Sequence, residues 1–366
     1  MEELVIDFAD ASTQVFHIGE ESVAVPGLVA GMAHAHRRFG RLPWATLVGP
    51  AIDLARAGVP VNEAQAFLHE ILVPILQRDE GGRRIYGQGD PLPTADIVPT
   101  LELIRDAAAA AVPQLLPELA GDIARYEVVE RAPRQERLGS AALVTTPSPS
   151  IGGSVVCDAL ASLLAGRNLH DWARAIGLAY SAVGTTSRVT GTTQVSVIDS
   201  DLGVAGFSST LGSGSGVFRH GFQLNNMLGE LDVIGTGPRI AGERLPSMMA
   251  PTLILEADRP RLVLGSAGSV RLAGAIAQVA WHVTHGMPVG DAVSAPRLHV
   301  DGATLHLEGG WDDDAVARLY TNGWDVVRWS GRNLFFGGVS AVERRPDGSF
   351  AAAGDPRRGG HGVVVP

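Results

Sequence analysis

Cysteine is almost absent from this sequence, because Cys157 is the single one among 366 residues. One thiol can form neither an intrachain disulfide framework nor a multi-cysteine zinc site. Long apolar runs are absent too: no stretch of about 18 or more uninterrupted apolar residues occurs, so the sequence predicts no membrane-spanning helix. Positive charge is outnumbered, with 29 lysines and arginines against 39 aspartates and glutamates. The formal net charge of −10 argues against a nucleic-acid partner, which would require a basic surface.

Neither the first residues of the chain nor its histidine and aspartate clusters form a pattern typical of a signal peptide or a metal site. Met1–Asp7 has no basic segment followed by an apolar one, so no signal peptide is visible and the compartment stays open. His34 and His36 are two residues apart, so a helix would direct them to different faces. Asp312–Asp314 fits the first turn of a helix, where carboxylates complement the helix dipole. We therefore predict neither a metal nor a cofactor.

What the sequence does contain is typical of a globular enzyme. Hydrophobic residues make up 45% and charged residues 19%, enough for a large buried core. Helices are expected at residues 31–39, 42–58, 94–112, 154–164 and 270–285. Strands are expected at residues 194–199, 204–209, 253–256, 262–265, 305–308, 324–329 and 339–343. A helix-rich first half and a strand-rich second half, without an internal repeat, favour a layered α/β architecture over two independent domains.

The segment Gly191–Asp199 places a threonine hydroxyl at the start of an alternating apolar strand. Cleavage of the Gly191–Thr192 bond would give Thr192 both a hydroxyl nucleophile and a free α-amine. A neighbouring amine that accepts the hydroxyl proton is a known way to activate a threonine. The same residues also fit an ordinary strand entry, where β-branched side chains are favoured. Both interpretations stay open on the local sequence alone.

Short motifs are distributed over nearly the whole chain in a consistent order and spacing. They are Val23–Gly31, Arg41–Trp44, Pro50–Ala55, Pro147–Gly153, Thr192–Asp199, Leu224–Glu230, Pro251–Thr252 and Gly354–Arg357. Together they resemble the γ-glutamyltransferase family. Each motif alone would be a weak indication, whereas the whole series in register is a strong one.

The resemblance implies the fold of an N-terminal-nucleophile hydrolase, a four-layer αββα sandwich. Such a protein is made as a precursor that cuts itself before its catalytic threonine. Thr192 stands at that position, so the resemblance implies a large-subunit-like segment at residues 1–191 and a small-subunit-like segment at residues 192–366. The two segments would remain associated as one intertwined domain.

The resemblance also implies roles for particular residues. Thr192 would attack the γ-carbonyl of a glutamyl amide such as glutathione, with its own amine as base, and water or an acceptor amine would resolve the acyl-enzyme. Thr210 matches the residue that orients the nucleophile. Gly268 and Ser269 match the pair whose backbone N–H groups form the oxyanion hole, and backbone donors survive the change from the family's second glycine to serine.

Two further residues match substrate contacts of the family. Glu230 lies where an acidic residue holds the substrate's α-amine, and Ser247 matches the first of two serines that bind the α-carboxylate. Three positions depart from the family pattern: Met248 replaces the second serine, Gly212 replaces an asparagine near the nucleophile, and Gln194 replaces a histidine. A less polar carboxylate site would alter the acyl preference.

The start of the chain departs further from the family pattern. Ala9 stands where an arginine grips the α-carboxylate, and loss of such a charge-assisted hydrogen bond, about 1.5–3 kcal/mol, would weaken binding by roughly one to two orders of magnitude. The chain also begins well inside the family pattern, so the sheet is expected to be incomplete at one edge. An uncovered edge invites association with another chain. We therefore expect either an upstream segment or a homodimer.

Three functions remain open from the sequence. The first is a self-cleaving γ-glutamyltransferase-like enzyme that acts on a small-molecule γ-glutamyl amide. The second is an acylase with non-glutamyl specificity. The third is an unprocessed, catalytically impaired relative that acts as a non-enzymatic protein. Because both Thr192 and Thr210 are present, the sequence favours an enzyme.

Overall fold

The structure is a computed structural model that describes residues 1–8, 12–166, 168–182 and 191–365. Backbone contacts divide the chain into two compact units. Unit 1 comprises residues 1–130 and 211–230, and unit 2 comprises residues 131–210 and 231–366. Each unit therefore contains residues from both sides of the Gly191–Thr192 bond. Among the described residues, no helix has the length and apolar character needed to cross a membrane.

Unit 1 is mainly helical and carries two small hairpins. Strands β1 (Glu2–Phe8) and β2 (Ser12–Ile18) pair antiparallel, as do β7 (Phe218–Arg219) and β8 (Phe222–Gln223). Its α-helices are α1 (Leu28–Phe39), α2 (Trp44–Ala57), α3 (Glu63–Leu76), α4 (Glu80–Tyr86), α5 (Val98–Ala107), α6 (Val112–Leu115) and α7 (Ala120–Arg125). Short 3-10 helices connect them at η1 (Glu20–Ser22), η2 (Ala95–Ile97), η3 (Ala108–Ala111), η4 (Pro117–Leu119) and η5 (Met227–Gly229).

The prediction of one alanine-rich helix over residues 94–112 is wrong in its extent. The α-helical part, α5, begins at Val98, and Pro99 occupies its first turn, where a missing N–H has no intrahelical partner to lose. The helix ends where Ala108 adopts a φ of 47°, a backbone conformation that interrupts the right-handed helix. Alanine favours a continuous helix, but the local backbone geometry breaks this one.

Side-chain hydrogen bonds fix the helix starts and loops of unit 1. Asn62 and Gln65 form a capping box at the start of α3. Asp79 caps α4 and also accepts a hydrogen bond from the backbone N–H of Phe218 at 2.7 Å, which ties α4 to β7. The Asn225 amide exchanges two hydrogen bonds of 2.9 Å with the backbone of Ala24, and this explains why their two motifs occur together.

Unit 2 is built on a six-stranded antiparallel sheet with the order β15-β14-β10-β9-β4-β3. In chain order its strands are β3 (Arg134–Leu138), β4 (Ala141–Thr145), β9 (Thr252–Glu256), β10 (Arg259–Ala267), β14 (Gly338–Arg344) and β15 (Phe350–Gly354). The central strand β10 is buried over most of its length, as its apolar sequence predicts.

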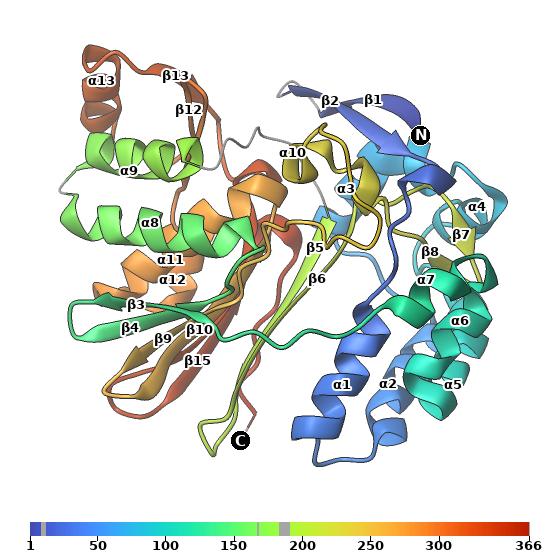
Figure 1. Cartoon of the computed structure of the whole chain (residues 1–366). Helices are drawn as coiled ribbons and strands as arrows, with labels where there is room; N and C mark the ends of the chain where they lie inside the picture. The colour runs from blue at the N-terminus through green and yellow to red at the C-terminus, as the bar shows by residue number, and fades with distance from the viewer. Residues whose placement is uncertain (9–11, 167, 183–190, 366) are drawn as a thin grey trace. The chain divides into compact units, whose positions relative to one another are not determined.

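Helices cover one face of this sheet (Figure 1). They are α8 (Ile151–Ala165), α11 (Leu272–Thr284) and α12 (Val289–Ser294), and α9 (Leu169–Ser181) packs on α8. Helix α11 packs against α8 and against strands β10 and β14. Most residues of α8 and α11 are buried, because a helix that is apolar on nearly all sides must lie in a core.

A second, two-stranded sheet packs on the six-stranded sheet. Its strands β5 (Gly191–Ile198) and β6 (Val204–Gly212) form a hairpin, and β5 contacts both β10 and β14. Exposed and half-buried residues alternate along β5, as expected for a strand with one covered face. Helices, six-stranded sheet and hairpin follow one another as α, β and β layers (Figure 1).

A small mixed sheet completes unit 2. Its order is β11-β12-β13, and β12 pairs antiparallel with β11 and parallel with β13. Its elements and the remaining short helices are β11 (Leu298–Asp301), β12 (Thr304–Leu307), β13 (Asp325–Arg328), α10 (Leu231–Ile234), α13 (Asp313–Thr321), η6 (Ser269–Arg271), η7 (Leu334–Phe336) and η8 (Pro356–Arg358). Asp312 caps α13 by accepting from the Ala315 N–H at 2.9 Å, so the acidic run does begin a helix.

Candidate active site

Thr192 and Thr210 lie on the paired strands of the hairpin. Thr192 is half-buried and shares a face of β5 with Ser196, whose Oγ donates to the Ser340 carbonyl of β14 at 3.0 Å. This face is therefore directed at the six-stranded sheet. Thr210 Oγ1 donates a hydrogen bond of 2.5 Å to the carbonyl oxygen of Gly191. That carbonyl belongs to the Gly191–Thr192 peptide bond, so the Thr210 hydroxyl contacts the bond predicted to be cut.

The direction of the hairpin follows from its contacts with β10. A Cβ built on Gly206 would lie 3.7 Å from Val263 Cγ1. Further along β6, Ser208 hydrogen-bonds Gln194, whose Oε1 would lie 2.2 Å from a Cβ built on Gly265. As β6 advances, its neighbours on β10 advance as well. The hairpin end that carries both threonines therefore points toward the C-terminal end of β10.

The turn that follows β10 has an unusual backbone. Gly268 has a φ of 132° and Ser269 a φ of 56°. A Cβ on Gly268 would lie 2.8 Å from Gly337 Cα, so only glycine fits there. Both residues are buried, yet within the described residues neither backbone N–H donates a hydrogen bond. Buried N–H groups without an acceptor are rare, and they can stabilise a negative charge that develops beside them.

The Ser269 side chain adds a second unsatisfied group to this turn. Ser269 is 3% exposed, and its Oγ has no hydrogen-bond partner among the residues that the structure describes. Tyr180 of α9 holds the backbone just beyond: its hydroxyl donates to Val270 O at 2.6 Å and accepts from Gly274 N at 2.9 Å. Burial raises the pKa of Tyr180, so this hydroxyl stays protonated and keeps donating. The turn is thus rigidly held while its donors remain available.

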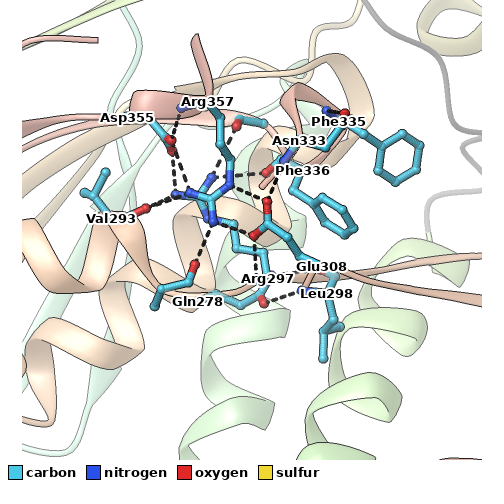
Figure 2. Close-up of polar contacts among 12 residues, drawn as sticks. Gln278, Val293, Arg297, Leu298, Glu308, Asn333, Phe335, Phe336, Asp355 and Arg357 are labelled. Atoms are coloured by element: carbon cyan, nitrogen blue, oxygen red, sulfur yellow. Dashed lines mark hydrogen bonds and ion pairs between the residues drawn. The ribbon is translucent and has the colours of Figure 1, made fainter. Parts of the chain in front are cut away.

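A buried network of charges surrounds the Gly354–Arg357 motif (Figure 2). The Asp355 carboxylate accepts from Arg297 Nη2 at 2.6 Å, from Val339 N at 2.9 Å and from Arg357 Nη1 at 3.1 Å. Arg357 Nε also donates to Glu308 Oε1 at 2.7 Å, and a second bond joins its Nη2 to the other carboxylate oxygen. The guanidinium of Arg357 is therefore bidentate to Glu308, the geometry that gives the strongest such pairs.

The charges of this network stabilise one another. Burial by itself would raise the pKa of Asp355, but the positive charges of Arg297 and Arg357 outweigh it and lower that pKa. Burial would lower the pKa of Arg357, but its hydrogen bond to Glu308 and the charge of Asp355 outweigh burial and raise it. For Arg297 burial dominates and lowers the pKa. The carboxylate of Asp355 is therefore ionised at neutral pH.

The network also supports the turn after β10. Asp355 holds the backbone of Val339, and Gly337, two residues earlier, is the residue that faces Gly268. Arg297 Nη1 donates to the Gly337 carbonyl at 3.3 Å, which fixes the same segment from the other side. The last family motif thus has a structural role at the candidate oxyanion hole.

Glu230 lies in unit 1 and holds the loop that follows β6. Its Oε1 accepts from Ser213 N at 3.0 Å, and the residue is 7% exposed. Asn226 holds the same loop by accepting from Gly214 N at 3.1 Å and donating to Ser213 Oγ at 2.6 Å. Gly212 packs so closely that an added Cβ would lie 2.1 Å from Asn226 Oδ1. An asparagine at position 212 therefore does not fit this loop conformation.

Ser247 lies beside the Pro147–Gly153 loop in unit 2. Its carbonyl accepts from Ile151 N at 2.8 Å, and its Oγ accepts from Met249 N at 3.0 Å. A Cβ on Gly152 would lie 1.9 Å from the Met248 carbonyl, which explains the glycine in the loop motif. The Met248 side chain is 3% exposed and belongs to the hydrophobic core of unit 2.

The structure thus brings some predicted residues together. Thr192 and Thr210 occupy one end of the hairpin, and Gly268 and Ser269 follow the end of β10 toward which that hairpin end points. Ala9, the expected site of a missing arginine, lies outside the described residues. Sequence reasoning missed the buried Arg297 and Glu308 and the half-buried Arg358. Two consecutive arginines after an Asp-Pro step, in an otherwise apolar region, were the available signal.

Comparison with known proteins identifies the family. Residues 3–112 and 170–365 match the sequence profile described as Gamma-glutamyltranspeptidase. The chain belongs to the gamma-glutamyltranspeptidase family. This family is one of enzymes, and the resemblance inferred from the motifs is confirmed.

Individual relatives share about a quarter of their residues with this family member. The Glutathione hydrolase 5 proenzyme of Rattus norvegicus is 26% identical over 440 residues, which cover 93% of this chain and 76% of that protein. The Acylase ACY 1 proenzyme of Pseudomonas sp. (strain SE83) is 26% identical, covering 95% of this chain and 76% of that protein. The crystal structure of cephalosporin acylase from Bacillus halodurans superposes with a TM-score of 0.78 at 18% identity, covering 94% of this chain and 79% of that one. This likeness confirms the predicted N-terminal-nucleophile hydrolase fold.

Proposed function

We propose that this chain cuts its own Gly191–Thr192 bond and then uses Thr192 to hydrolyse or transfer a γ-glutamyl group from glutathione or a related amide. The observation that carries the proposal is the hydrogen bond from Thr210 to the Gly191 carbonyl. A hydroxyl aimed at the carbonyl of the bond to be cut is suited to stabilise the negative charge that forms there.

Self-cleavage begins with attack of Thr192 Oγ on the Gly191 carbonyl carbon. The carbonyl oxygen gains negative charge in the tetrahedral intermediate, and Thr210 Oγ1 donates its hydrogen bond to that oxygen. The C–N bond then breaks, and the Thr192 nitrogen takes up the proton from the hydroxyl. Water hydrolyses the resulting ester, leaving a carboxylate on Gly191 and a free α-amine on Thr192.

The transfer reaction would reuse the same hydroxyl. The α-amine of Thr192 takes the proton from Oγ as Oγ attacks the substrate carbonyl, and the amine of the substrate leaves with that proton. The N–H groups of Gly268 and Ser269 are proposed to stabilise the oxyanion, at a value of about 3 kcal/mol for each such donor. Glu230 and Ser247 are proposed to bind the α-amine and α-carboxylate of a glutamyl group.

The paired strands support continued association of the two segments after cleavage. Strand β4, from residues 1–191, pairs with β9, from residues 192–366, in the register Ala141↔Glu256 to Val144↔Leu253. Helix α8 of the first segment packs against α11 of the second. Cleavage at residue 191 leaves this sheet and this helix contact intact.

An acylase with another acyl preference is the second candidate. Two observations favour it: the similarity to an acylase proenzyme, and Met248, which is buried in the core where the family has a second carboxylate-binding serine. Both candidates use the same nucleophile and differ only in the acyl group.

A denaturing gel tests the shared mechanism. Wild-type protein should separate into two fragments, and Thr192→Ala protein should remain one band. Amino-terminal sequencing should show that the smaller fragment begins at Thr192, and a start at Thr193 would show that Thr192 is not the nucleophile. If wild-type protein also stays whole after prolonged incubation, the enzymatic proposal is wrong and the chain is a non-enzymatic relative.

Chromogenic anilides then separate the two candidates. A γ-glutamyl transferase should release the aniline from a γ-glutamyl anilide at least tenfold faster than from a glutaryl anilide, which lacks the α-amine. Equal turnover of the two would favour the acylase. Thr192→Ala protein is the control for background hydrolysis.

A further inference from the structure

Arg358 is a cation beside the candidate oxyanion turn that the proposed mechanism leaves unused. Its Nη2 would lie 3.8 Å from a Cβ built on Gly268. Its aliphatic stem packs over Gly338, where a built Cβ would lie 2.6 Å from Arg358 Cδ. The side chain is thus held between the first residue of β14 and the turn, and its charged end reaches the turn.

The hydrogen bonds of Arg358 are incomplete. Nη2 donates to the Leu334 carbonyl at 3.2 Å, while Nε is buried without a partner in the part of the chain that the structure describes. The described ion pairs include none with Arg358. Burial lowers the pKa of Arg358 to about 10, and the charge of Asp355 only partly opposes this. The guanidinium therefore remains charged at neutral pH.

The neighbouring network does not neutralise this charge. Asp355 and Glu308 already pair with Arg297 and Arg357, two negative charges against two positive ones. Arg358 adds a third positive charge, so the cluster has an excess of one. A charge that is shielded from water without a charged partner is costly, and groups perturbed in this way cluster at functional sites.

A second unsatisfied group lies on the same turn. Ser269 Oγ is buried and unpartnered, as described above. Arg271 is also close in sequence, but it is less suited to bind a substrate. It is 2% exposed, and its guanidinium stacks 4.4 Å from the Phe335 ring centroid. Arg358 is half-buried, so it is less enclosed than Arg271.

We propose that Arg358 binds a carboxylate of the acyl group and selects short acyl chains that end in a carboxylate. This inference rests on the proposed function, because it places the reacting carbonyl at the Gly268–Ser269 turn. The terminal carboxylate accepts from the guanidinium, and the carbonyl accepts from the backbone N–H groups. Arg358 thus supplies at the far end of the chain the positive charge that Ala9 cannot.

The test compares glutaryl anilide with its neutral isostere, 4-carbamoylbutanoyl anilide, for wild type, Arg358→Gln and Arg358→Lys. One charge-assisted hydrogen bond corresponds to roughly 10- to 100-fold in kcat/KM. Wild type should prefer the carboxylate by that factor. Arg358→Gln should lose the preference while keeping its kcat/KM for the neutral substrate within about threefold, and Arg358→Lys should retain part of it.

A matched control and a binding assay complete the design. Arg332→Gln removes an exposed arginine and should leave the preference unchanged. Equal losses on both substrates in Arg358→Gln would overturn the proposal in favour of a structural or oxyanion role. Calorimetric titration of glutarate, which has no amide to cleave, needs no turnover: binding to processed wild-type protein that disappears in processed Arg358→Gln supports the carboxylate site. Turnover without preference, and without glutarate binding, overturns the site while the proposed function stands.

Discussion

Replacement of Thr210 by valine removes one hydroxyl with almost no change in shape. In the structure this hydroxyl donates to the Gly191 carbonyl at 2.5 Å. As Thr192 attacks, that oxygen becomes an oxyanion, and the hydrogen bond strengthens because its acceptor gains charge. Loss of one such donor costs about 2.7–4 kcal/mol of transition-state stabilisation, which corresponds to roughly 10²–10³-fold in rate. We expect self-cleavage of Thr210→Val to slow by that factor.

The rate of precursor loss is the quantity to measure. Synthesis in a cell-free translation system with a short radioactive pulse, followed by a chase, yields precursor of defined age. Samples taken over the chase and separated on a denaturing gel give the first-order rate constant of cleavage. Intact-mass measurement at the end confirms that the cut lies before Thr192.

Two variants control for effects on folding. Thr210→Ser keeps a hydroxyl and should restore cleavage to within about tenfold of wild type. Ser209→Ala changes the adjacent residue, on the opposite face of β6, and should cleave like wild type. Cleavage of Thr210→Val at a rate within tenfold of wild type would refute the reasoning, because the contact would then have no role in the transition state.

Three further results are expected. Asp355→Asn leaves Arg297 buried without a charged partner and should lower the free energy of unfolding, measured in urea, by about 3–5 kcal/mol. The control Asp347→Asn changes an exposed residue and should alter the free energy of unfolding little. Similar values for both variants would contradict a stabilising role of the network. Gly268→Ala should abolish anilide turnover in protein that still folds by circular dichroism, since its Cβ would meet Gly337 Cα at 2.8 Å; unchanged kcat would show that the turn adapts. Burial, aided by the charge of Arg297, lowers the pKa of His282 to about 4, so the neutral His282 stabilises the fold above pH 6.5 and this contribution is lost as the pH falls toward 4. The melting temperature of His282→Gln should therefore fall less steeply than that of wild type over this range, and parallel declines would contradict the lowered pKa.

Much of the fold followed from local patterns in the sequence. The alternation in β5 and the apolar stretch of α11 were predicted because period-2 and all-round apolar patterns reflect the geometry of a strand and of a buried helix. The extent of the helix at residues 94–112 was wrong, because alanine propensity is a weak influence that local backbone geometry at Ala108 overrides. Strands β1 and β2 were not predicted, since a lone hairpin carries little periodic signal.

The candidate site was predicted only in part. Thr192, Gly268 and Ser269 could be named from motifs, because their roles depend on short stretches of backbone. Asp355 and Arg357 belong to a motif that was named, but their network with Arg297 and Glu308 could not be predicted, since its members come from separate segments that meet only in the core. Charged residues are usually exposed, and apart from the two arginines after the Asp-Pro step no local sequence feature indicates that these are buried.

The sequence by itself determined the family, the nucleophile candidate and the positions of strands such as β5, β9 and β10, because these depend on local spacing and on motifs read along the chain. Tertiary structure alone decided that the Thr210 hydroxyl meets the carbonyl of Gly191 and that Arg358 stands beside Gly268. Such contacts depend on the packing of sheets and turns that bring distant segments within hydrogen-bonding distance. The backbone geometry of strands and helices repeats along the chain and leaves a pattern in the sequence. Contacts between side chains of distant segments are fixed only once the core has formed.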